Sequence, residues 1–337
     1  MAEIISKNGV LVAKKKNKNL NPIIITVFVI LMLYAISLFI ILGWGLLTSL
    51  KSADDFKFAP DGAGALGLPT KKWSSEQLAF KNYTIVIALF RYKPGNFSYF
   101  SSIWGEIPNV GDFQYFGDFV FNSIMYAVVC TFVQTFVCMT SAYMCCKYRY
   151  KFSYFIYTML LVIMTIPLIG TGPATIEILQ TLGIFDTYFS MILMSANFTG
   201  MYFFVYFAFF QGVSTTYMEA AEIDGSSQLM IYLRIMFPLA LKMYGTVSLI
   251  TFIALWNNYA TPLLYYPTKP TLAYAIYHMT NTTDNRDLIG GAADTIDLQE
   301  VPARVAGCMI LAIPMIILFV ALKNVILGNL SMGGLKE

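Results

Sequence analysis

The sequence predicts an all-α, polytopic membrane protein with six transmembrane helices, and two observations support this prediction. Of the 337 residues, 57% are hydrophobic and only 12% are charged, whereas a soluble domain carries roughly 25% charged residues. The charges gather in short segments between long uncharged runs. Because several of these runs are long enough to form a membrane-spanning helix, we expect a chain that crosses the bilayer repeatedly.

The first apolar run follows a polar N-terminal segment, residues 1–21, which we expect to lie in the cytoplasm. Lys14, Lys15, Lys16 and Lys18 precede the run, and positive charge beside a span is retained on the cytoplasmic side. The first transmembrane helix is assigned to residues 22–50. A signal peptide has a core of only about 7–15 apolar residues, so we interpret this longer stretch as an uncleaved span.

Residues 51–118 form a mixed-charge segment with many glycines, prolines and aromatic residues. Its lysines and arginines argue against a position outside the cell, but loops longer than about 60 residues largely escape the charge rule. A loop of this length is usually functional or locally structured. We therefore expect an extracytoplasmic loop, or a small cap packed from the aromatic side chains.

Residues 119–330 are expected to hold the other five transmembrane helices. The second span is predicted over Phe119–Cys146, and the basic sequence KYRYK at residues 147–151 follows it, which is typical of a short cytoplasmic loop. The third begins at Phe152. Pro167 should end or kink that helix near residues 165–166, because proline cannot continue the hydrogen-bond ladder.

The later spans are separated by acidic segments without basic residues, or by longer polar ones. A short helix at the membrane surface is expected before the fourth span. Asp186 should cap the fourth span, which should end at about Gln211. The fifth is predicted over about Met243–Tyr266. The sixth is predicted over about Ala303–Leu327, with a break at Pro314. Residues 331–337 then form a cytoplasmic tail, so that both termini lie inside.

One polar stretch lies on the cytoplasmic side between the fourth and fifth spans. Thr216 followed by Glu219 has the spacing of a capping box, which predicts the start of a helix. Gly225 is a plausible stop for that helix, one of the serines at 226–227 can cap a second helix, and Pro238 should end the second one. A helix, a break and a helix held between two spans form a docking element.

The chain lacks the motifs of an enzyme. No GxxxxGK[ST] phosphate-binding loop, HExxH or GxSxG occurs, so the chain is not expected to hydrolyse ATP itself. His278, the single histidine, is predicted in an outer loop, and the five cysteines do not have the spacing of zinc ligands. We therefore expect no metal site. The net charge of +3 gives no reason to expect a nucleic-acid partner.

The spans also lack ionisable residues at their centres. Transporters driven by an ion gradient usually keep such residues along the pathway, because a charge in lipid is costly and is retained for function. Coupling to an ion gradient is therefore disfavoured. Energy for any transport is expected from a separate subunit.

The polar stretch carries a family resemblance. With Glu219-Ala220-Ala221, then Asp224-Gly225, then Phe237-Pro238-Leu239, the loop at residues 212–242 resembles the EAA loop of permease subunits in ABC importers. The surroundings are similar to the carbohydrate branch, specifically the second permease subunit of the maltose type. The further motifs are, in chain order, Asn122-Ser123, Ala142-Tyr143, Pro167, Leu182-Gly183-Ile184, Asp186-Thr187-Tyr188, Leu255-Trp256-Asn257-Asn258-Tyr259, Pro262-Leu263-Leu264 and Gly333-Gly334-Leu335-Lys336.

This resemblance implies a permease subunit of the bacterial cytoplasmic membrane that pairs with a second, similar permease chain. The pair would sit on two ATPase subunits, which use ATP and Mg²⁺, and an extracellular sugar-binding protein would deliver the solute. This chain would bind no cofactor. Its first cytoplasmic helix would enter a cleft of one ATPase subunit, and the implied coupling residues are Glu219, Ala220, Ala221, Asp224, Gly225 and Pro238.

A sugar pathway needs hydrogen-bonding side chains and an aromatic face for stacking. The candidates in the predicted spans are Asn122, Gln134, Asn197, Trp256, Asn257, Asn258 and Tyr259. Polar residues in membrane helices also bond one helix to another, so packing is the alternative interpretation for each of them.

Three functions therefore compete. The first is a permease subunit of an ATP-driven sugar importer. The second is a permease of the same superfamily for another solute, such as a peptide, an acidic sugar derivative or a polyol. The third is a membrane scaffold without transport, which predicts neither a docking loop nor polar residues along the spans.

Overall fold

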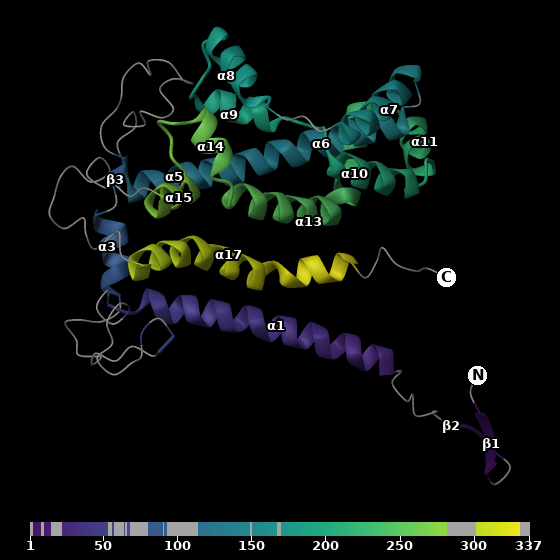
Figure 1. The fold of residues 1–337 in the computed structure, drawn as a ribbon. Coiled ribbons are helices and arrows are strands. Elements are labelled where there is room, and N and C mark those ends of the chain that lie inside the picture. Colours follow the sequence, from purple (N-terminus) through teal and green to yellow (C-terminus); the bar gives the residue numbers. More distant parts are fainter. Residues whose placement is uncertain are drawn as a thin grey trace.

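The computed structural model describes residues 3–7, 10–14, 22–52, 80–89, 91–92, 114–148, 150–166, 170–281 and 301–330, with isolated positions at 56, 64, 66 and 67. In these ranges the chain is mostly helical, and its long helices lie side by side (Figure 1). Helix α1 (Pro22–Ser49) packs on α17 (Val301–Leu330), α17 on α13 (Phe237–Trp256), and α13 on α6 (Cys130–Lys147). The shorter α10 (Met201–Gly212) also packs on α6.

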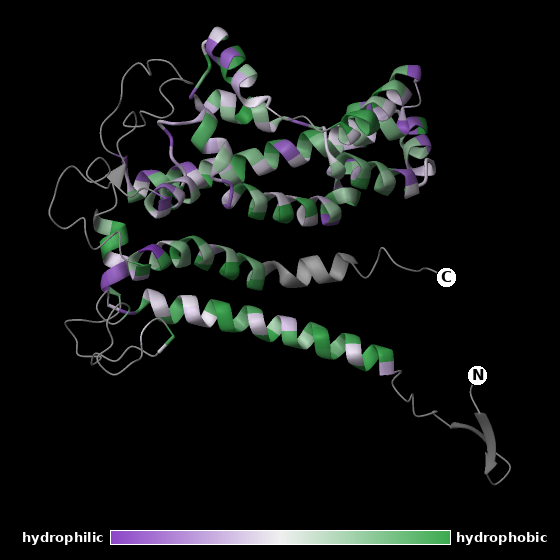
Figure 2. Ribbon diagram, viewed as in Figure 1, coloured by the Kyte–Doolittle hydropathy of each residue, from purple (hydrophilic) through white to green (hydrophobic). Residues whose placement is uncertain are grey.

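The described residues contain four helical stretches that are long and apolar enough to cross a membrane: Pro22–Ser49, Phe116–Lys147, Gln228–Trp256 and Val301–Ala321. Helices α7 (Lys151–Thr165) and α10 are apolar but shorter. Figure 2 shows hydrophobic residues along the whole of α1, and most of its large apolar side chains are exposed. A soluble protein rarely exposes so large an apolar surface, so the fold is that of a polytopic membrane protein, as predicted.

Two of the four stretches contain a π-helical turn. One runs through α5 (Phe116–Ile124), η1 (Met125–Val129) and α6. The other runs through α12 (Gln228–Ile231), η2 (Tyr232–Met236) and α13.

The prediction that Pro238 ends a helix is wrong, because the helix passes through Pro238 into α13. In a regular α-helix a proline ring clashes with the carbonyl four residues earlier. The wider π turn directly before Pro238 relieves that clash. As a result, the long helix begins at Gln228 rather than Met243 and ends at Trp256 rather than Tyr266.

Two further helix breaks differ from the prediction. The predicted fourth span consists of α9 (Tyr188–Ser195) and α10, which are separated by a non-helical segment ending at Gly200, where φ is +148°. Conversely, α17 continues through Pro314, where a break was predicted. A single proline is tolerated in a membrane helix when nearby groups satisfy the freed carbonyl.

The ends of α7 and α8 agree with the sequence prediction. Helix α7 ends at Thr165, and Ile166 is extended with φ −89° and ψ 117°, as the residue before a proline prefers to be; Pro167 itself lies outside the described residues. Helix α8 (Gly172–Thr181) is the predicted short helix, and it ends before Gly183, whose φ is +67°.

The described chain also contains two short antiparallel sheets, so the all-α prediction holds only for its long elements. Strand β1 (Glu3–Lys7) pairs with β2 (Val10–Lys14), and β3 (Arg91–Tyr92) pairs with β4 (Gln114–Tyr115). The sequence between β1 and β2 is Asn-Gly, the pair that most favours a two-residue hairpin turn. The prediction for residues 1–21 overlooked that signal.

Part of the predicted outer loop is helical. Helix α3 (Lys81–Leu89) packs on α17 and buries Ile85 and Val86. Its Asn82 side-chain amide donates hydrogen bonds to the backbone oxygens of Ser49 (2.8 Å) and Lys51 (2.7 Å), which satisfies carbonyls at the end of α1. Most of the predicted cap lies outside the described residues.

The elements divide between the two ends of the bundle (Figure 1). The N-terminal end of α1, the C-terminal ends of α6 and α17, and α11 (Thr216–Ile223) lie at one end, whereas α3, α8 and α15 (Leu272–Asn281) lie at the other. The predicted topology requires both termini and α11 to lie at the same end of the bundle, and it places that end in the cytoplasm.

A buried cluster lies at each end of the bundle. The cluster at the α15 end includes Phe119, Trp256 and Tyr274, and the cluster at the α11 end includes Tyr143, Tyr206 and Met236. His278 lies on α15 and is buried, not in a loop as predicted. Burial lowers the pKa of His278 to about 4, so it is neutral at pH 7.

Gly45 lets α1 approach α17 closely, which gives a test of this packing. A Cβ on Gly45 would lie 2.7 Å from Met309 Cε, whereas a Cβ on Gly43 would meet no atom within 4 Å. Because Met309 Cε is the end of a flexible side chain that can shift, we expect Gly45→Val to reduce stability by about 1 kcal/mol, the low end of the cost of overpacking, and to lower the melting temperature in detergent. Gly43→Val is the matched control and should melt like the unmodified protein. Equal melting temperatures for the two variants would contradict the close approach.

Candidate functional site

Helix α11 begins at the predicted residue, but the predicted capping box does not form. The Thr216 N–H donates to Ser214 Oγ over 3.2 Å. Thr215, the residue before the helix, is already helical with φ −69° and ψ −19° and forms no side-chain cap. An N-cap residue is normally extended. Glu219 is therefore left exposed on the helix surface.

The turn after α11 is closed by two backbone hydrogen bonds around Gly225. The Gly225 N–H donates to the Glu222 oxygen (3.0 Å), and the Ser226 N–H donates to the Ala221 oxygen (3.0 Å). This pair of bonds is the Schellman motif, which places its glycine in the left-handed region, and Gly225 has φ +79°. The prediction of Gly225 as the stop of α11 is confirmed.

The second helix of the element starts at the predicted serine pair. Ser227 Oγ accepts a hydrogen bond from the Met230 N–H (3.4 Å) and caps α12. Because α12 continues into η2 and α13, this cap is also the first turn of a candidate membrane span. The turn between α11 and α12 is thus directly joined to a long membrane helix.

The two faces of α11 have different environments. Met218 and Ala221 are buried in the cluster formed by α6, α10, η2 and α13. Ala220, Glu222 and Asp224 are exposed. Ile223 at the tip is 85% exposed. Ala221 therefore fixes α11 to its own chain, and the exposed face remains for a partner.

Hydrogen bonds fix α11 and α12 to the end of α6. Gln228 Nε2 donates to Glu222 Oε1 (2.6 Å), and the Tyr148 hydroxyl donates to Gln228 Oε1 (2.5 Å). Beside them, Lys147 Nζ donates to the Val213 oxygen (2.6 Å) at the end of α10. Helix α11 is therefore hydrogen-bonded through Gln228 to α12 and to the residue after α6, and α6 is hydrogen-bonded to the end of α10.

Of the six predicted coupling residues, five lie on α11 or in the turn that follows it. Pro238 lies apart, exposed in the first turn of α13.

Three of the predicted pathway residues use their polar groups inside the chain. Asn122 is buried, donates to the Pro270 oxygen (3.1 Å) and accepts from the Tyr188 hydroxyl (2.7 Å). Trp256 is buried, and its Nε1 donates to the Leu311 oxygen on α17 (3.1 Å).

Asn258, the third, caps α14 (Ala260–Tyr265) by accepting from the Thr261 N–H (3.1 Å), and it also donates to the Tyr126 hydroxyl (3.3 Å). These contacts support the packing interpretation for the three residues.

The remaining pathway candidates are more accessible. Asn197 and Asn257 are exposed and bond locally, Asn197 to Thr199 and Asn257 to the Ile253 oxygen (3.0 Å). Gln134 is half-buried on α6. Tyr259 is 40% exposed and stacks on Tyr277 of α15 at 4.0 Å between ring centroids and 10° between planes. Sequence reasoning did not find Tyr277, because its partner lies on another element.

A second contact that the sequence did not reveal joins the loop before α9 to the loop before α15. Asp186, predicted to cap the fourth span, has φ +56° and leaves the capping of α9 to Thr187, whose side chain accepts from the Ser190 N–H (3.1 Å). The Asp186 carboxylate instead accepts from the Thr268 hydroxyl and lies 3.6 Å from Lys269 Nζ.

Burial raises the pKa of Asp186, and its contacts with Thr268 and Lys269 oppose that shift. The ion pair with Lys269 thus offsets part of the free-energy cost of burying the Asp186 carboxylate in its charged form.

These features define an integral membrane protein with long apolar helices and an exposed, acidic helix at one end. The chain belongs to the family described as "Binding-protein-dependent transport system inner membrane component", which matches residues 139–331. It is a multi-pass protein of the inner membrane, and such a component is a noncatalytic part of its transport system.

Curated relatives include three permease proteins. The chain is 34% identical over 107 residues to the polygalacturonan/rhamnogalacturonan transport system permease protein YtcP of Bacillus subtilis, covering 32% of this chain and 37% of YtcP. It is 28% identical to the sn-glycerol-3-phosphate transport system permease protein UgpE of Pectobacterium atrosepticum, covering 49% and 60%. It is 24% identical to the arabinooligosaccharides transport system permease protein AraQ of Bacillus subtilis, covering 64% and 72%. The matched region thus spans less than two thirds of YtcP and of UgpE.

The fold resembles that of a solved structure over nearly its whole length. A chain in the crystal structure of a bacterial ABC transporter involved in the import of the acidic polysaccharide alginate superposes with a TM-score of 0.64 at 19% identity. The superposition covers 93% of this chain and 99% of that one. This likeness establishes the fold.

The left-handed turn at Gly225 can be tested with two substitutions. A β-branched residue is strongly disfavoured at positive φ, and the left-handed conformation costs about 1–2 kcal/mol for such side chains. We expect Gly225→Val to open the turn and to raise the rate of protease cleavage between α11 and α12 by about 5- to 30-fold. Gly225→Asn should stay close to the unmodified rate, because asparagine tolerates this conformation. Gly183→Val carries the same strain at the other end of the bundle and should leave cleavage at this turn unchanged. Identical rates for the valine and asparagine variants at 225 would refute the strain argument.

The Asp186–Lys269 pair predicts a pH-dependent effect on stability. A raised carboxyl pKa favours the folded state at low pH, and that contribution is lost as the pH rises through the folded pKa. Removing Lys269 raises the pKa of Asp186 further, because the charged form loses its partner. Lys269 also donates to the Asp186 backbone oxygen and lies over the Tyr188 ring, so Lys269→Gln should lose some stability at every pH. We expect that loss to grow by about 2 kcal/mol between pH 4 and pH 7, as measured by unfolding in detergent. Lys269→Arg keeps the charge and is the control. A loss that does not change with pH would show that the ion pair is not its cause.

Proposed function

We propose that this chain is the permease subunit of an ATP-driven importer for sugars, such as oligosaccharides. It would form half of the translocation pathway together with a second, similar permease chain. Two ATPase subunits would bind ATP and Mg²⁺, and an extracellular sugar-binding protein would supply the solute. The observation that carries this proposal is the exposed face of α11. The opposite face of that helix is buried against its own chain, and its C-terminal end is joined through the turn at Gly225 to a long apolar helix.

The proposed coupling follows from that arrangement. Glu219 offers a charge to a basic partner, and the small Ala220 allows close approach of a partner surface. Ile223 at the tip supplies an exposed apolar contact, of the kind that carries binding energy when a pocket covers it. ATP-driven closure of the ATPase pair would move α11, and the hydrogen bonds through Gln228 would pass that movement to α6 and α13 as a rigid-body rotation.

The proposed topology has six spans with both ends in the cytoplasm. The four long apolar stretches supply four spans, and α7 and the α9–α10 pair supply the shorter ones. Lys147 and Lys151, which flank the connection between α6 and α7, lie at the α11 end of the bundle, in accord with retention of positive loops in the cytoplasm. The side of the membrane that holds α15 and the Asp186–Lys269 pair is then extracytoplasmic.

The proposed solute is uncharged, because the exposed pathway candidates are amides and a tyrosine. Gln134, Asn197 and Asn257 offer donors and acceptors to sugar hydroxyls, and Tyr259 offers a ring face. Permeases for arabinooligosaccharides and for melibiose, raffinose and stachyose, which are neutral sugars, are among the relatives, whereas the polygalacturonan of another relative is an acidic polymer. The sn-glycerol-3-phosphate permease UgpE is a further relative, which makes a phosphorylated polyol the second candidate.

The decisive experiment is to tag the chain, solubilise its native membranes gently and identify the proteins that co-purify. We expect an ATPase subunit and a second permease of the same family. Transport by the reconstituted assembly, with neutral oligosaccharides and sn-glycerol-3-phosphate as competing solutes, would then separate the two solute classes. Recovery of the folded chain without an ATPase would overturn the importer proposal and favour the scaffold alternative.

The two adjacent alanines of α11 allow a sharp test of docking. Ala220 is exposed and Ala221 is buried. We expect Ala220→Trp to fold normally and to lose at least about 90% of the co-purified ATPase, equivalent to about 1.4 kcal/mol or more of binding free energy. Ala221→Trp should instead lower the melting temperature, because it overpacks the buried face.

Ala174→Trp, on the exposed surface of α8 at the other end of the bundle, is the matched control and should retain the ATPase. Normal ATPase recovery with Ala220→Trp would rule out this face as the docking surface.

A further inference from the structure

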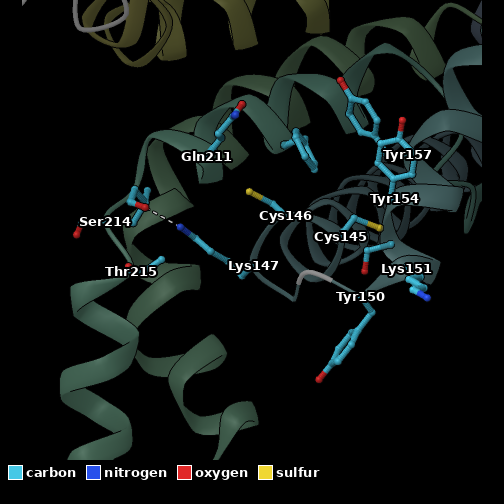
Figure 3. Close-up of a pocket in the computed structure, with 13 residues that line it drawn as sticks. Cys145, Cys146, Lys147, Tyr150, Lys151, Tyr154, Tyr157, Gln211, Ser214 and Thr215 are labelled. Carbon is cyan, nitrogen blue, oxygen red and sulfur yellow. Dashed lines mark hydrogen bonds between the residues drawn. The ribbon is translucent and has the colours of Figure 1, made fainter.

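A pocket of about 1170 Å³ opens between the ends of α6 and α10 and the starts of α7 and α11 (Figure 3). Lys147 and Lys151 line it from the α6–α7 side, and Gln211, Ser214 and Thr215 line it from the α10–α11 side. Neither the docking face of α11 nor the candidate solute pathway includes these side chains. The pocket is therefore separate from both of those proposed sites.

The charged lining of the pocket is basic. Among its described lining residues, Lys147 and Lys151 are the charged ones, and none is acidic. Two helix N-termini and two helix C-termini meet here, so their dipoles largely cancel, and the lysines determine the sign of the potential. Lys147 uses one N–H for the Val213 oxygen (2.6 Å), and an ammonium group has three. Thr215 adds a hydroxyl group to the lining, and the Ser214 hydroxyl, also in the lining, is hydrogen-bonded to Thr216. This chemistry suits a phosphate group.

The surface next to the pocket is apolar and aromatic. On α7, Phe152 and Phe155 are exposed, and Tyr154, which also lines the pocket, is 74% exposed. Tyrosine with exposed apolar neighbours at the end of a span is typical of the membrane–water interface. The pocket volume also exceeds the roughly 300–1,000 Å³ of a typical small-ligand site. A free phosphate ion would fill only a small part of the pocket and would make no contact with the apolar surface beside it.

We propose that this pocket binds the phosphate headgroup of an anionic phospholipid from the cytoplasmic leaflet. Basic pockets between membrane helices on this side of a membrane bind such headgroups. The lysines would hold the phosphate, and the acyl chains would lie along the exposed face of α7. A bound lipid would thereby bridge α7 and the connection between α10 and α11, next to the docking helix.

The test uses the purified full-length chain in a nonionic detergent, titrated with dioleoyl phosphatidylglycerol. Native mass spectrometry counts the lipids bound per chain, and dioleoyl phosphatidylcholine is the neutral comparison. We expect phosphatidylglycerol to bind more tightly than phosphatidylcholine and Lys151→Gln to weaken its binding about fivefold, the usual contribution of one lysine near a membrane surface. Lys151 is exposed, so this variant should fold normally. Lys147→Gln should add a similar loss.

Lys242→Gln is the matched control, because Lys242 is exposed near the start of α13 and does not line the pocket. Its affinity for phosphatidylglycerol should equal that of the unmodified chain. Equal binding of the two lipids, or an unchanged affinity in Lys151→Gln, would overturn the proposal. No transport assay is involved, so this result is independent of the proposed sugar import.

Two further experiments distinguish a lipid from other molecules that could occupy the pocket. Inorganic phosphate and glycerol 1-phosphate serve as soluble probes, and either one displacing phosphatidylglycerol at submillimolar concentration would assign the pocket to a soluble anion. In the tagged complex, loss of ATPase from the lysine variants with unchanged lipid binding would assign it to a protein interface. Either outcome would refute a lipid site.

Discussion

The hydrocarbon of a bilayer offers no hydrogen-bond partner, so each backbone N–H and C=O within it must be satisfied by the protein. The architecture follows from this constraint. The long spans are continuous helices, and side chains satisfy backbone groups at several helix ends. Asn82 reaches from α3 to the carbonyls at the end of α1. Asn258 supplies the acceptor for the first turn of α14. Thr187 does the same for α9.

The same constraint explains why the polar docking element lies where it does. Helix α11 carries the exposed carboxylates of Glu219, Glu222 and Asp224, which only the aqueous end of the bundle can accommodate. Helix α11 meets this requirement by burying Met218 and Ala221 against the span ends and by exposing its charged side. Because α12 is the first turn of the next long helix, the element has no flexible linker that would absorb a displacement.

The candidate pathway illustrates how one residue type serves two purposes. An amide buried among helices must be fully hydrogen-bonded, because an unsatisfied polar group costs free energy in an apolar environment. Asn122 and Asn258 meet that requirement through Tyr188 and Tyr126, and they stabilise the contact between α5, α9 and α14. The accessible amides and the Tyr259–Tyr277 stack have surface left for a solute. The buried and the accessible pathway candidates differ in burial, although the sequence shows the same residue types for both.

Local sequence signals predicted features that depend on the backbone alone. Gly225 and Gly183 mark helix ends because only residues without a Cβ adopt positive φ at little cost. The residue before Pro167 is extended for an equally local steric reason. The failures involve competition between local and neighbouring groups. Pro238 and Pro314 continue their helices, and Asp186 turns away from α9 to pair with Lys269, 83 positions along the chain.

By itself, the sequence determined the membrane class, the long apolar helices at both ends of the chain and the bounds of helix α11, because hydrophobic runs and glycine turns act over a few residues. Only the tertiary structure decided which face of α11 remains exposed, which amides are already saturated, and where two lysines and a row of aromatic side chains form one pocket. These properties depend on contacts between residues far apart in the chain. A periodic pattern shows that a helix has an inner face, but the partner that covers that face is fixed only when the helices pack.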